Sequence, residues 1–487
     1  MNDSPLPYTE RLLAKTKIVA TVGPRSNSVE QIRQLATAGV DIFRLNFAHG
    51  DHDEMINIVD GIRRVSDELD RPLGILGDLA GPKIRLGKLP HQGLLLEQGQ
   101  SLSFHRHADP ENPTSLSSTY ERLIDDLKVG DRLLLADGSV TMRVVEKEQD
   151  LAECVVVQPG LLRSRQGINL PGVNLRLPSL TEKDHHDLAW AMEQKLDFIG
   201  LSFVRSSNDI QELRRQIVLH PSEWSPWIVA KIEKPEALDN LEDIVAETDA
   251  VMVARGDLGV EVDIVRVPML QKRIINTCNR YRVPVITATQ MLDSMQQVDR
   301  PTRAEASDVL NSVLDGSDAL MLSGETAIGR YPIESVIIMS RIAGEAEQHV
   351  QSIKDLPLGL RSRNLATQTT RALTLGAIHA AEQLSAKLIV VLTRSGATAI
   401  AVSELRSPIP ILALTDDAIA ARRMCLAWGV TPVVTNVCQA APHTLIDFVV
   451  NWGRERCILE AGDRLVLVGT TDWSQVGKDL MLVHVVD

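Results

Sequence analysis

Eight short apolar runs recur along the first two thirds of the chain, and each one ends in polar or glycine-rich residues. Most are uniformly apolar and rich in β-branched residues, which is typical of strands buried in a parallel sheet. The runs cover residues 16–23, 41–47, 73–79, 198–203, 227–233, 250–256, 284–290 and 319–325. In a (β/α)8 barrel, the C-terminal strand ends meet at one mouth, where active sites lie. The pattern therefore predicts an α/β fold, a (β/α)8 TIM barrel, with functional residues at these strand ends.

The spacing of the strand ends is regular except at one place. The interval between the ends at residues 79 and 203 is 124 residues, whereas the other intervals between strand ends are 23 to 35 residues. Because a strand and its helix take about 25 to 40 residues in such a barrel, about 90 residues are left over. We expect an inserted domain at residues 84–178 and a discontinuous barrel at residues 1–83 and 179–350.

The insert and the C-terminal part of the chain have patterns of their own. Residues 133–145 indicate a strand, an Asp-Gly turn and a second strand, so we expect a small β-barrel or sandwich. Two connections tie this insert to the barrel mouth, where it could act as a lid. After a helix near 334–350, a helix near 366–384 and strands at 386–393, 410–415, 430–435, 463–469 and 480–486 predict a C-terminal α/β domain at residues 351–487.

Composition and charge exclude several classes of partner. The 487 residues carry a formal net charge of −13 and contain no apolar run long enough to span a membrane, so we expect neither nucleic acid nor a membrane as a partner. Five cysteines without metal-ligand spacing favour reduced thiols over a disulfide framework. Residues 1–11 lack an apolar signal core, so we expect a cytoplasmic protein.

Motifs at the strand ends, taken together, resemble those of pyruvate kinases. In order, they are residues 20–24 (ATVGP), 44–50 (RLNFAHG), 77–85 (GDLAGPKIR), 231–233 (KIE), 252–259 (MVARGDLG), 287–292 (TATQML), 300–305 (RPTRAE) and 322–327 (LSGETA). Any one of them alone would be weak evidence, but the ordered series spans nearly the whole chain. The resemblance implies phosphoryl transfer from phosphoenolpyruvate to ADP, giving pyruvate and ATP, and a homotetramer.

Glu233 and Asp257 follow adjacent predicted strands, so both carboxylates can face one metal ion at the mouth. Mg²⁺ prefers hard oxygen ligands and leaves several positions to water and substrate; the alternatives are a loop cap or an ion pair with a base. Lys231 precedes Glu233 by two residues and shares its face of the strand. There it could neutralise phosphoryl charge or only form a salt bridge. The resemblance implies Mg²⁺ (or Mn²⁺) at the two carboxylates and transition-state stabilisation by Lys231.

Further basic residues suit phosphate groups. Arg44 could grip a phosphate with both arms of its guanidinium group, or form an ion pair. In the family, this arginine contacts the transferring phosphoryl group, and the positions of Asn46 and His49 lie near the nucleotide. Arg85 and Lys183 match further nucleotide-phosphate contacts. Lys183 also lies in a capping-box sequence, where it could be a solvated first-turn residue.

The resemblance also implies substrate contacts at the last three strand ends. They are Ala254, Arg255, Gly256, Asp257, Thr289, Ser323 and Glu325. Gly256 would let the substrate carboxylate approach the backbone closely. Thr289 would lie on the path that delivers a proton to the enolate carbon, and the donor could be a water held by Thr289, Ser323 and Glu325.

Potassium-dependent members of the family bind K⁺ with an asparagine, a serine, an aspartate and a backbone carbonyl. Asn46 and Asp78 stand at two of these positions, but Ala48 replaces the serine. Lys83 stands where potassium-dependent members carry glutamate, and Leu79 also suits members that need no K⁺. Because a tethered ammonium group can supply the missing positive charge, we expect that K⁺ is not required; the alternative is that Lys83 is only a surface lysine.

A turn of the C-terminal domain is a candidate effector site. It consists of Thr393, Arg394, Ser395, Gly396, Ala397 and Thr398, between a predicted strand and helix. Hydroxyl groups, a glycine and a helix start favour phosphate, although ordinary strand–helix turns look similar. The resemblance implies a phosphorylated metabolite as activator. Residues 469–478 (GTTDWSQVGK) match the second effector loop of the family only loosely.

Two other functions compete with this interpretation. A metal-dependent aldolase or lyase would explain Glu233, Asp257 and Gly256. It would not explain the insert or the further basic residues, described above, that suit phosphate groups. A silent sugar-phosphate sensor that kept the scaffold would be expected to lose Lys231, Glu233 or Asp257, and all three are present. The motifs therefore favour the kinase.

Overall fold

The structure is a computed structural model that describes residues 15–89, 93–106, 112, 114–173, 175–222, 224–350, 368–470 and 479–487. Eight parallel strands close into a barrel in the order β1-β16-β15-β14-β13-β12-β3-β2. They are β1 (Lys17–Thr21), β2 (Ile42–Asn46), β3 (Gly74–Asp78), β12 (Phe198–Leu201), β13 (Trp227–Ile232), β14 (Ala250–Ala254), β15 (Val285–Ala288) and β16 (Ala319–Leu322). Each strand lies within one of the eight apolar runs, so the predicted barrel is confirmed.

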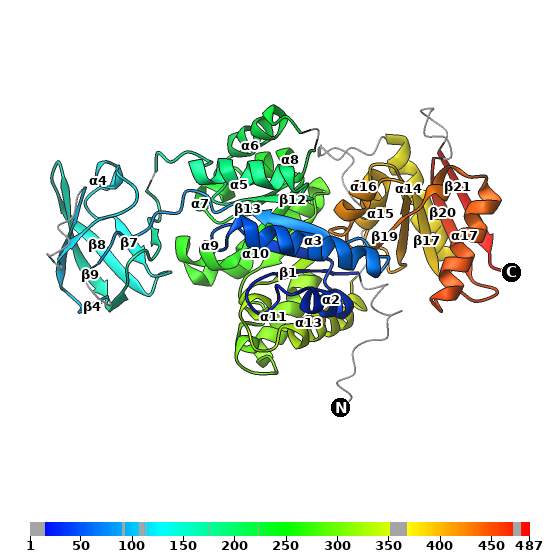
Figure 1. The fold of residues 1–487 in the computed structure, drawn as a ribbon, viewed down its shortest axis with the longest axis horizontal. Helices are drawn as coiled ribbons and strands as arrows, with labels where there is room; N and C mark the ends of the chain where they lie inside the picture. The colour runs from blue at the N-terminus through cyan, green and yellow to red at the C-terminus, as the bar shows by residue number, and fades with distance from the viewer. Residues whose placement is uncertain are drawn as a thin grey trace.

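Helices surround this barrel (Figure 1). They are α2 (Val29–Ala38), α3 (His52–Glu68), α5 (Glu182–Glu193), α6 (Ser207–Leu219), α7 (Pro235–Asp239), α8 (Leu241–Glu247), α9 (Arg255–Glu261), α10 (Val267–Tyr281), α11 (Arg303–Leu314), α12 (Gly324–Ala327) and α13 (Pro332–Glu347), with the 3-10 helices η1 (Ile264–Arg266) and η2 (Asp293–Gln296). The capping box expected from the sequence begins α5: Thr181 and Asp184 each bind the backbone N–H of the other. Local sequence thus fixes where this helix starts.

Four aspartates tie the strands together at the N-terminal end of the barrel. Each stands directly before an alternate strand and accepts the backbone N–H of the preceding strand at 2.8 to 2.9 Å. The pairs are Asp41 with Ile18, Asp197 with Ile75, Asp249 with Ile228 and Asp318 with Val285. Each aspartate also pairs with an arginine: Arg71, Arg63, Arg214 and Arg406 in the same order. This end of the barrel is therefore held by repeated carboxylate contacts.

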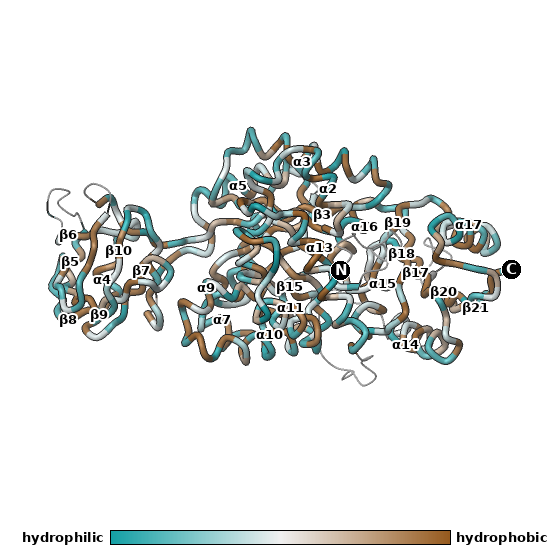
Figure 2. Tube along the Cα trace, turned by 90° about the horizontal axis from the view of Figure 1, so that it is seen from below, coloured by the Kyte–Doolittle hydropathy of each residue, from teal (hydrophilic) through white to brown (hydrophobic). Residues whose placement is uncertain are grey.

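The insert, which lies between β3 and β12 in the chain, is at the other end of the barrel, beyond the C-terminal strand ends. Its elements are β4 (Leu94–Leu96), β5 (Ser101–His105), β6 (Ser115–Leu116), α4 (Leu123–Asp126), β7 (Arg132–Leu135), β8 (Val140–Lys147), β9 (Leu151–Gln158), β10 (Gly160–Leu162) and β11 (Ile168–Asn169). They form a six-stranded sheet, β11-β7-β8-β9-β5-β6, and a two-stranded sheet, β10-β4, around one apolar core. β7 and β8 pair antiparallel, as the sequence predicts. Figure 2 shows how narrow the connection to the barrel is.

The C-terminal region packs against the opposite end of the barrel (Figure 1). It contains α14 (Gln368–Gln383), β17 (Leu388–Leu392), α15 (Ala397–Ser403), β18 (Ile411–Thr415), α16 (Ala418–Met424), β19 (Val430–Val434), η3 (Asn436–Gln439), α17 (Pro442–Glu455), β20 (Arg464–Thr470) and β21 (Asp479–Val485). The five expected strands form one sheet, β19-β18-β17-β20-β21, in which only β21, at the edge, runs antiparallel. Arg422 of α16 binds Asp197 at 2.7 Å, so the aspartates described above also hold this region in place.

Buried apolar residues support the same organisation. One cluster runs from the barrel interior, with Val19 and Met252, into the C-terminal region, with Ile389 and Met424. All five cysteines are free thiols, as expected, and four of them are buried. None of the described helices is both long and apolar enough to cross a membrane.

Candidate active site

A buried chain of alternating charges lies at the barrel mouth. Arg44 on β2 donates to Asp78 Oδ2 at 2.8 Å, and Lys231 Nζ on β13 lies 3.2 Å from Asp78 Oδ1. The same Nζ lies 3.0 Å from Glu233 Oε1. Lys231 and Glu233 therefore share one face, as strand alternation predicts. The ion pairs with carboxylates that were the alternatives for Arg44 and Lys231 are both present.

Burial and charge shift the pKa values of this cluster in different directions. Burial alone would lower the pKa of Lys231, but Asp78 and Glu233 outweigh it and raise that pKa above its usual value. Burial opposes ionisation of Asp78 too, yet Lys231 and Arg44 bring its pKa below the usual range. For Glu233, burial prevails and raises the pKa despite the neighbouring Lys231. The cluster thus holds a firmly charged lysine beside a carboxylate that readily takes another positive partner.

Glu233 and Asp257 offer the donor set that a hard cation needs. Glu233 is buried; its Oε1 lies 3.0 Å from Lys231 Nζ, while Oε2 accepts the N–H of Phe203 at 2.8 Å. Asp257 lies in α9, directly after the neighbouring strand β14, with its side chain about a third exposed. Within the described residues, no three Asp, Glu, His or Cys side chains gather at one metal position. Two carboxylates together with substrate oxygens suit Mg²⁺.

The loop after β15 brings Thr289 against the start of α9. Thr289 Oγ1 accepts the N–H of Gly256 at 2.7 Å and donates to Ala288 O at 2.6 Å. Thr289 has a φ of +70°, which is costly for a β-branched residue and is typical of functional sites. Arg255 supports this strained turn: it donates to Thr289 O at 2.7 Å and pairs with Asp308 at 2.7 Å. Its guanidinium group is therefore already engaged.

Glu325 joins the loops after the last two barrel strands. Its carboxylate accepts the N–H groups of Leu292 at 3.0 Å and Ser323 at 2.8 Å. Burial raises the pKa of Glu325. The hydroxyl oxygen of Ser323 is buried and has no hydrogen-bond partner among the described residues. Ser323 thus keeps a free hydroxyl group near the mouth, whereas Glu325 is committed to backbone contacts.

The residues expected to contact the nucleotide divide into two groups. Asn46 and His49 line a cleft of about 360 Å³ between β1, β2, α3 and α12. Lys183 lies beside it, since its Nζ donates to Phe47 O and to Asp187, both at 2.7 Å. Arg85 lies at the start of the insert and donates to Arg165 O at 3.1 Å. The structure brings the first three together and leaves Arg85 on the insert.

Lys83 pairs with the candidate metal ligand Asp257 rather than with Asn46 or Asp78. Its Nζ lies 3.5 Å from Asp257 Oδ1 and 3.9 Å from Asp137 Oδ1 of the insert. Asp78 is occupied by Arg44 and Lys231, and Asn46 Oδ1 accepts the N–H of Ala48 at 3.1 Å. The ammonium group of Lys83 therefore lies at the mouth, next to a carboxylate.

The candidate effector turn is ordered by its own side chains. Gly396, with a φ of +87°, donates its N–H to Thr393 Oγ1 at 3.0 Å. The following helix, α15, has seven residues. Most of the loosely matching segment 469–478 lies outside the described residues.

The structure adds one residue to the site that the sequence did not single out. Ser202, directly after β12, accepts a hydrogen bond from Lys231 Nζ at 2.7 Å and donates to Leu79 O at 2.8 Å. It is a third partner of the ammonium group, besides Asp78 and Glu233. Its only sequence signal is a polar residue at a strand end, which alone does not distinguish it from an ordinary loop serine.

Fold and site together define an enzyme class: a (β/α)8 barrel with an inserted β domain, whose mouth gathers lysine, arginine and carboxylates suited to a phosphorylated substrate and a metal ion. Residues 13–336 match the family model for the pyruvate kinase barrel domain, and residues 371–484 match that for the pyruvate kinase alpha/beta domain. The chain belongs to the pyruvate kinase family. Enzymes of this family transfer the phosphoryl group of phosphoenolpyruvate to ADP, giving pyruvate and ATP, and generally use Mg²⁺.

Individual relatives agree with this assignment. A pyruvate kinase of Staphylococcus epidermidis is 40% identical over 477 residues, which cover 97% of this chain and 81% of the relative. A pyruvate kinase of Geobacillus stearothermophilus is 40% identical over 480 residues, which cover 97% of this chain and 80% of the relative. A crystal structure of a pyruvate kinase from Cryptosporidium parvum superimposes with a TM-score of 0.91 at 34% identity, covering 99% of this chain and 98% of that one.

Proposed function

We propose that the charge cluster of Arg44, Asp78, Lys231 and Glu233 is the phosphoryl-transfer centre of this enzyme. The observation that carries the proposal is the position of Lys231 Nζ, 3.2 Å from Asp78 and 3.0 Å from Glu233 at the mouth, where all three side chains are buried. Phosphoryl transfer depends mainly on positioning and on neutralising charge. Lys231, whose pKa is raised, and Arg44, which binds the same aspartate, supply the positioning and the positive charge.

Each residue then has a distinct part. Arg44 binds the phosphoryl group of phosphoenolpyruvate, and Lys231 neutralises charge on its equatorial oxygens as the group passes to ADP. Glu233 and Asp257 would hold Mg²⁺, which would neutralise further negative charge when bound. The substrate carboxylate contacts the segment of Ala254, Arg255 and Gly256. Arg255 acts indirectly, through its hydrogen bond to the turn at Thr289.

Proton delivery to the enolate carbon falls to the loops after β15 and β16. Thr289 is held in a strained conformation with its hydroxyl group directed at Gly256, and Ser323 keeps an unpartnered hydroxyl group. Glu325 orients both loops through its contacts to Leu292 and Ser323. A water held by these groups is the proton donor that the arrangement favours.

ADP would occupy the cleft of Asn46 and His49. Lys183 lies at its side, and Arg85 would reach the nucleotide phosphates when the insert closes as a lid. Closure of such domains excludes water and completes the constellation of catalytic groups.

We further propose that K⁺ is not required. The ammonium group of Lys83 lies at the mouth, 3.5 Å from Asp257, where it can replace the charge of a monovalent cation. Ala48 offers no side-chain oxygen in the place of the serine ligand.

Regulation and assembly remain predictions from the resemblance: a phosphorylated activator at residues 393–398, a homotetramer and a cytoplasmic location. Activation is tested by measuring the KM for phosphoenolpyruvate with panels of sugar phosphates and nucleoside monophosphates. An unchanged KM throughout would contradict the effector site.

The experiment that tests the proposed function is ATP formation from ADP and phosphoenolpyruvate, with Mg²⁺ and without K⁺. We expect turnover on the order of 1–100 s⁻¹, as is usual for kinases. A folded protein that forms no ATP under these conditions, but cleaves or condenses pyruvate derivatives, would instead be a lyase or aldolase.

A further inference from the structure

One short helix of the barrel, α9, contacts the insert directly. The side chain of Asn169, on β11 of the insert, donates from Nδ2 to Glu261 Oε1 at 2.8 Å. Glu261 is the last residue of α9, and both side chains are buried. A buried hydrogen bond to a carboxylate is stronger than a neutral one, and leaving either partner unpaired is costly.

A second part of the insert approaches the same helix. The turn between β7 and β8 contains Asp137 and Gly138, and a Cβ atom placed on Gly138 would lie 3.7 Å from Val260 Cγ1 of α9. Lys83 Nζ lies between Asp137 Oδ1 and Asp257 Oδ1, at 3.9 and 3.5 Å. The insert therefore meets the C-terminal end of α9 directly, whereas Lys83 connects Asp137 of the insert to Asp257 in the first turn of that helix.

Glu261 also connects to the segment that carries Glu233. Lys234 Nζ donates to Glu261 Oε1 at 2.6 Å and lies over the ring of Phe203, 5.8 Å from its centroid. The N–H of Phe203 in turn holds Glu233 Oε2. One carboxylate thus links the insert to the segments of both candidate metal ligands, Glu233 through Lys234 and Phe203, and Asp257 through α9.

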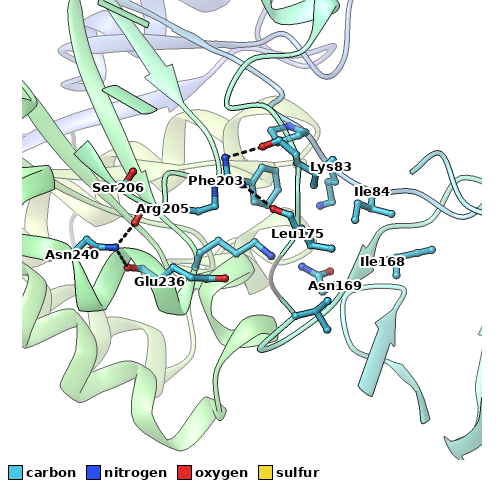
Figure 3. Close-up of a pocket in the computed structure, with 14 residues that line it drawn as sticks. Lys83, Ile84, Ile168, Asn169, Leu175, Phe203, Arg205, Ser206, Glu236 and Asn240 are labelled. Carbon is cyan, nitrogen blue, oxygen red and sulfur yellow. Dashed lines mark hydrogen bonds between the residues drawn. The ribbon is translucent and has the colours of Figure 1, made fainter. Parts of the chain in front are cut away.

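The linker that returns from the insert is anchored on both sides. Arg205 of the barrel donates to Leu175 O at 3.3 Å and Leu177 O at 3.0 Å, whereas Arg176 between them pairs with Asp126 of the insert at 2.7 Å. Figure 3 shows Arg205 directed at Leu175, with Asn169 on the side of the insert. The return linker is therefore held by the barrel on one side and by the insert on the other.

We propose that Glu261 is a positioning residue that transmits the position of the insert to α9 and so to Gly256 and Asp257. The inference rests on the proposed roles of Asp257 and Glu233. When the insert is seated, Asn169 and Lys234 hold the C-terminal end of α9, and its N-terminal end presents Asp257. Closure over the nucleotide is thereby coupled to the metal and substrate site, although Glu261 touches neither.

The test is an exchange of the two polar partners. Asn169→Asp sets two carboxylates against each other, and we expect at least tenfold lower kcat/KM for both ADP and phosphoenolpyruvate. We also expect at least tenfold weaker Mn²⁺ binding, measured by electron paramagnetic resonance with phosphoenolpyruvate and no nucleotide. The double variant Asn169→Asp/Glu261→Gln restores a donor–acceptor pair and should recover to within about threefold of the unchanged enzyme. Gln149→Glu makes the same chemical change at an exposed turn of the insert and should alter neither quantity.

Three results would overturn the proposal. They are unchanged Mn²⁺ binding in a folded Asn169→Asp variant, a folded double variant no better than the single one, and a loss confined to the KM for ADP. If both variants fail to fold, the single variant Glu261→Gln is the deciding test. A neutral amide at position 261 should weaken Mn²⁺ binding severalfold. Unchanged Mn²⁺ binding in this variant would contradict the proposal. Inactivity of the unchanged enzyme and of Gln149→Glu would instead count against the proposed function itself.

Discussion

The two ends of the barrel both bury carboxylates beside basic side chains, but they use these groups differently. At the N-terminal end, each of four aspartates accepts a strand N–H and binds an arginine, so these carboxylates serve to hold the strands together. At the mouth, Asp78 Oδ1 and Glu233 Oε1 instead lie 3.2 and 3.0 Å from the ammonium group of Lys231. The partner of a buried carboxylate therefore decides its role: contacts with the backbone stabilise the fold, whereas contacts among side-chain charges can be exchanged for a ligand.

The largest effect expected from this comparison is on catalysis at the mouth. Lys231→Met removes the central cation, and we expect kcat to fall by about 10³ or more, while the protein stays folded because Arg44 still binds Asp78 and Glu233 can take up a proton. Steady-state kinetics and circular dichroism measure both. Near-normal turnover would contradict the role of Lys231.

At the N-terminal end of the barrel, we expect a substitution to lower stability and to leave kcat nearly unchanged. Asp197→Ala removes the partner of Ile75 N–H, Arg63 and Arg422, leaving two arginines without it. We expect a loss of about 3–5 kcal/mol in stability, with kcat of the folded enzyme unchanged within about twofold. Thermal unfolding and kinetics below the transition measure this, with Asp197→Asn, which keeps an acceptor for Ile75, as the milder control. A large loss of kcat in the folded variant would remove the distinction between the two ends.

A smaller effect concerns the monovalent cation. We expect rates in Na⁺ or Tris salts to match those in K⁺, and Lys83→Glu to lower kcat/KM about tenfold, or about 1.4 kcal/mol, because it places a carboxylate next to Asp257. K⁺ should stimulate the variant Ala48→Ser/Lys83→Glu more than the unchanged enzyme. Strong K⁺ stimulation of the unchanged enzyme would show that Lys83 does not supply the charge.

The smallest effect lies where the C-terminal region meets the barrel. Glu404 is buried near Asp318, Arg406 and Arg282 and accepts no hydrogen bond from the described residues; burial raises its pKa to about 8. Between pH 4.5 and 8 the folded protein therefore holds a proton that the unfolded chain releases, so this group favours folding less as pH rises. Glu404→Gln should raise Tm by about 2 °C at pH 8 and by less at pH 5. An equal shift at both pH values would contradict the raised pKa.

The barrel was predictable because each strand is a short, wholly apolar run with polar residues at its end. The regular spacing of strand ends also located the insert, since 124 residues cannot belong to one strand–helix unit. The four aspartates were not foreseen, although each directly precedes a predicted strand. Their contacts join neighbouring strands 21 to 122 residues apart in the chain, and a periodic pattern does not report such pairs.

Within the site, proximity along one strand was predictable and proximity between strands was not. Strand alternation places Lys231 beside Glu233, and the structure agrees. Asp78 was interpreted only as part of a monovalent-cation region, yet it lies between Arg44 and Lys231. The positive φ of Thr289 depends on the contacts of its turn with α9, which no local sequence rule supplies for a β-branched residue.

The central claim is that Lys231, Glu233 and Asp257 surround one phosphorylated ligand and its metal ion. The most direct measurement is anomalous diffraction from crystals grown with Mn²⁺ and phosphoenolpyruvate, without nucleotide. The account predicts one Mn²⁺ peak bound by carboxylate oxygens of both Glu233 and Asp257, at about 2.1 Å as for Mg²⁺, with Lys231 Nζ on the phosphoryl group. A peak away from these two carboxylates, or a phosphoryl group out of reach of Lys231, would contradict it.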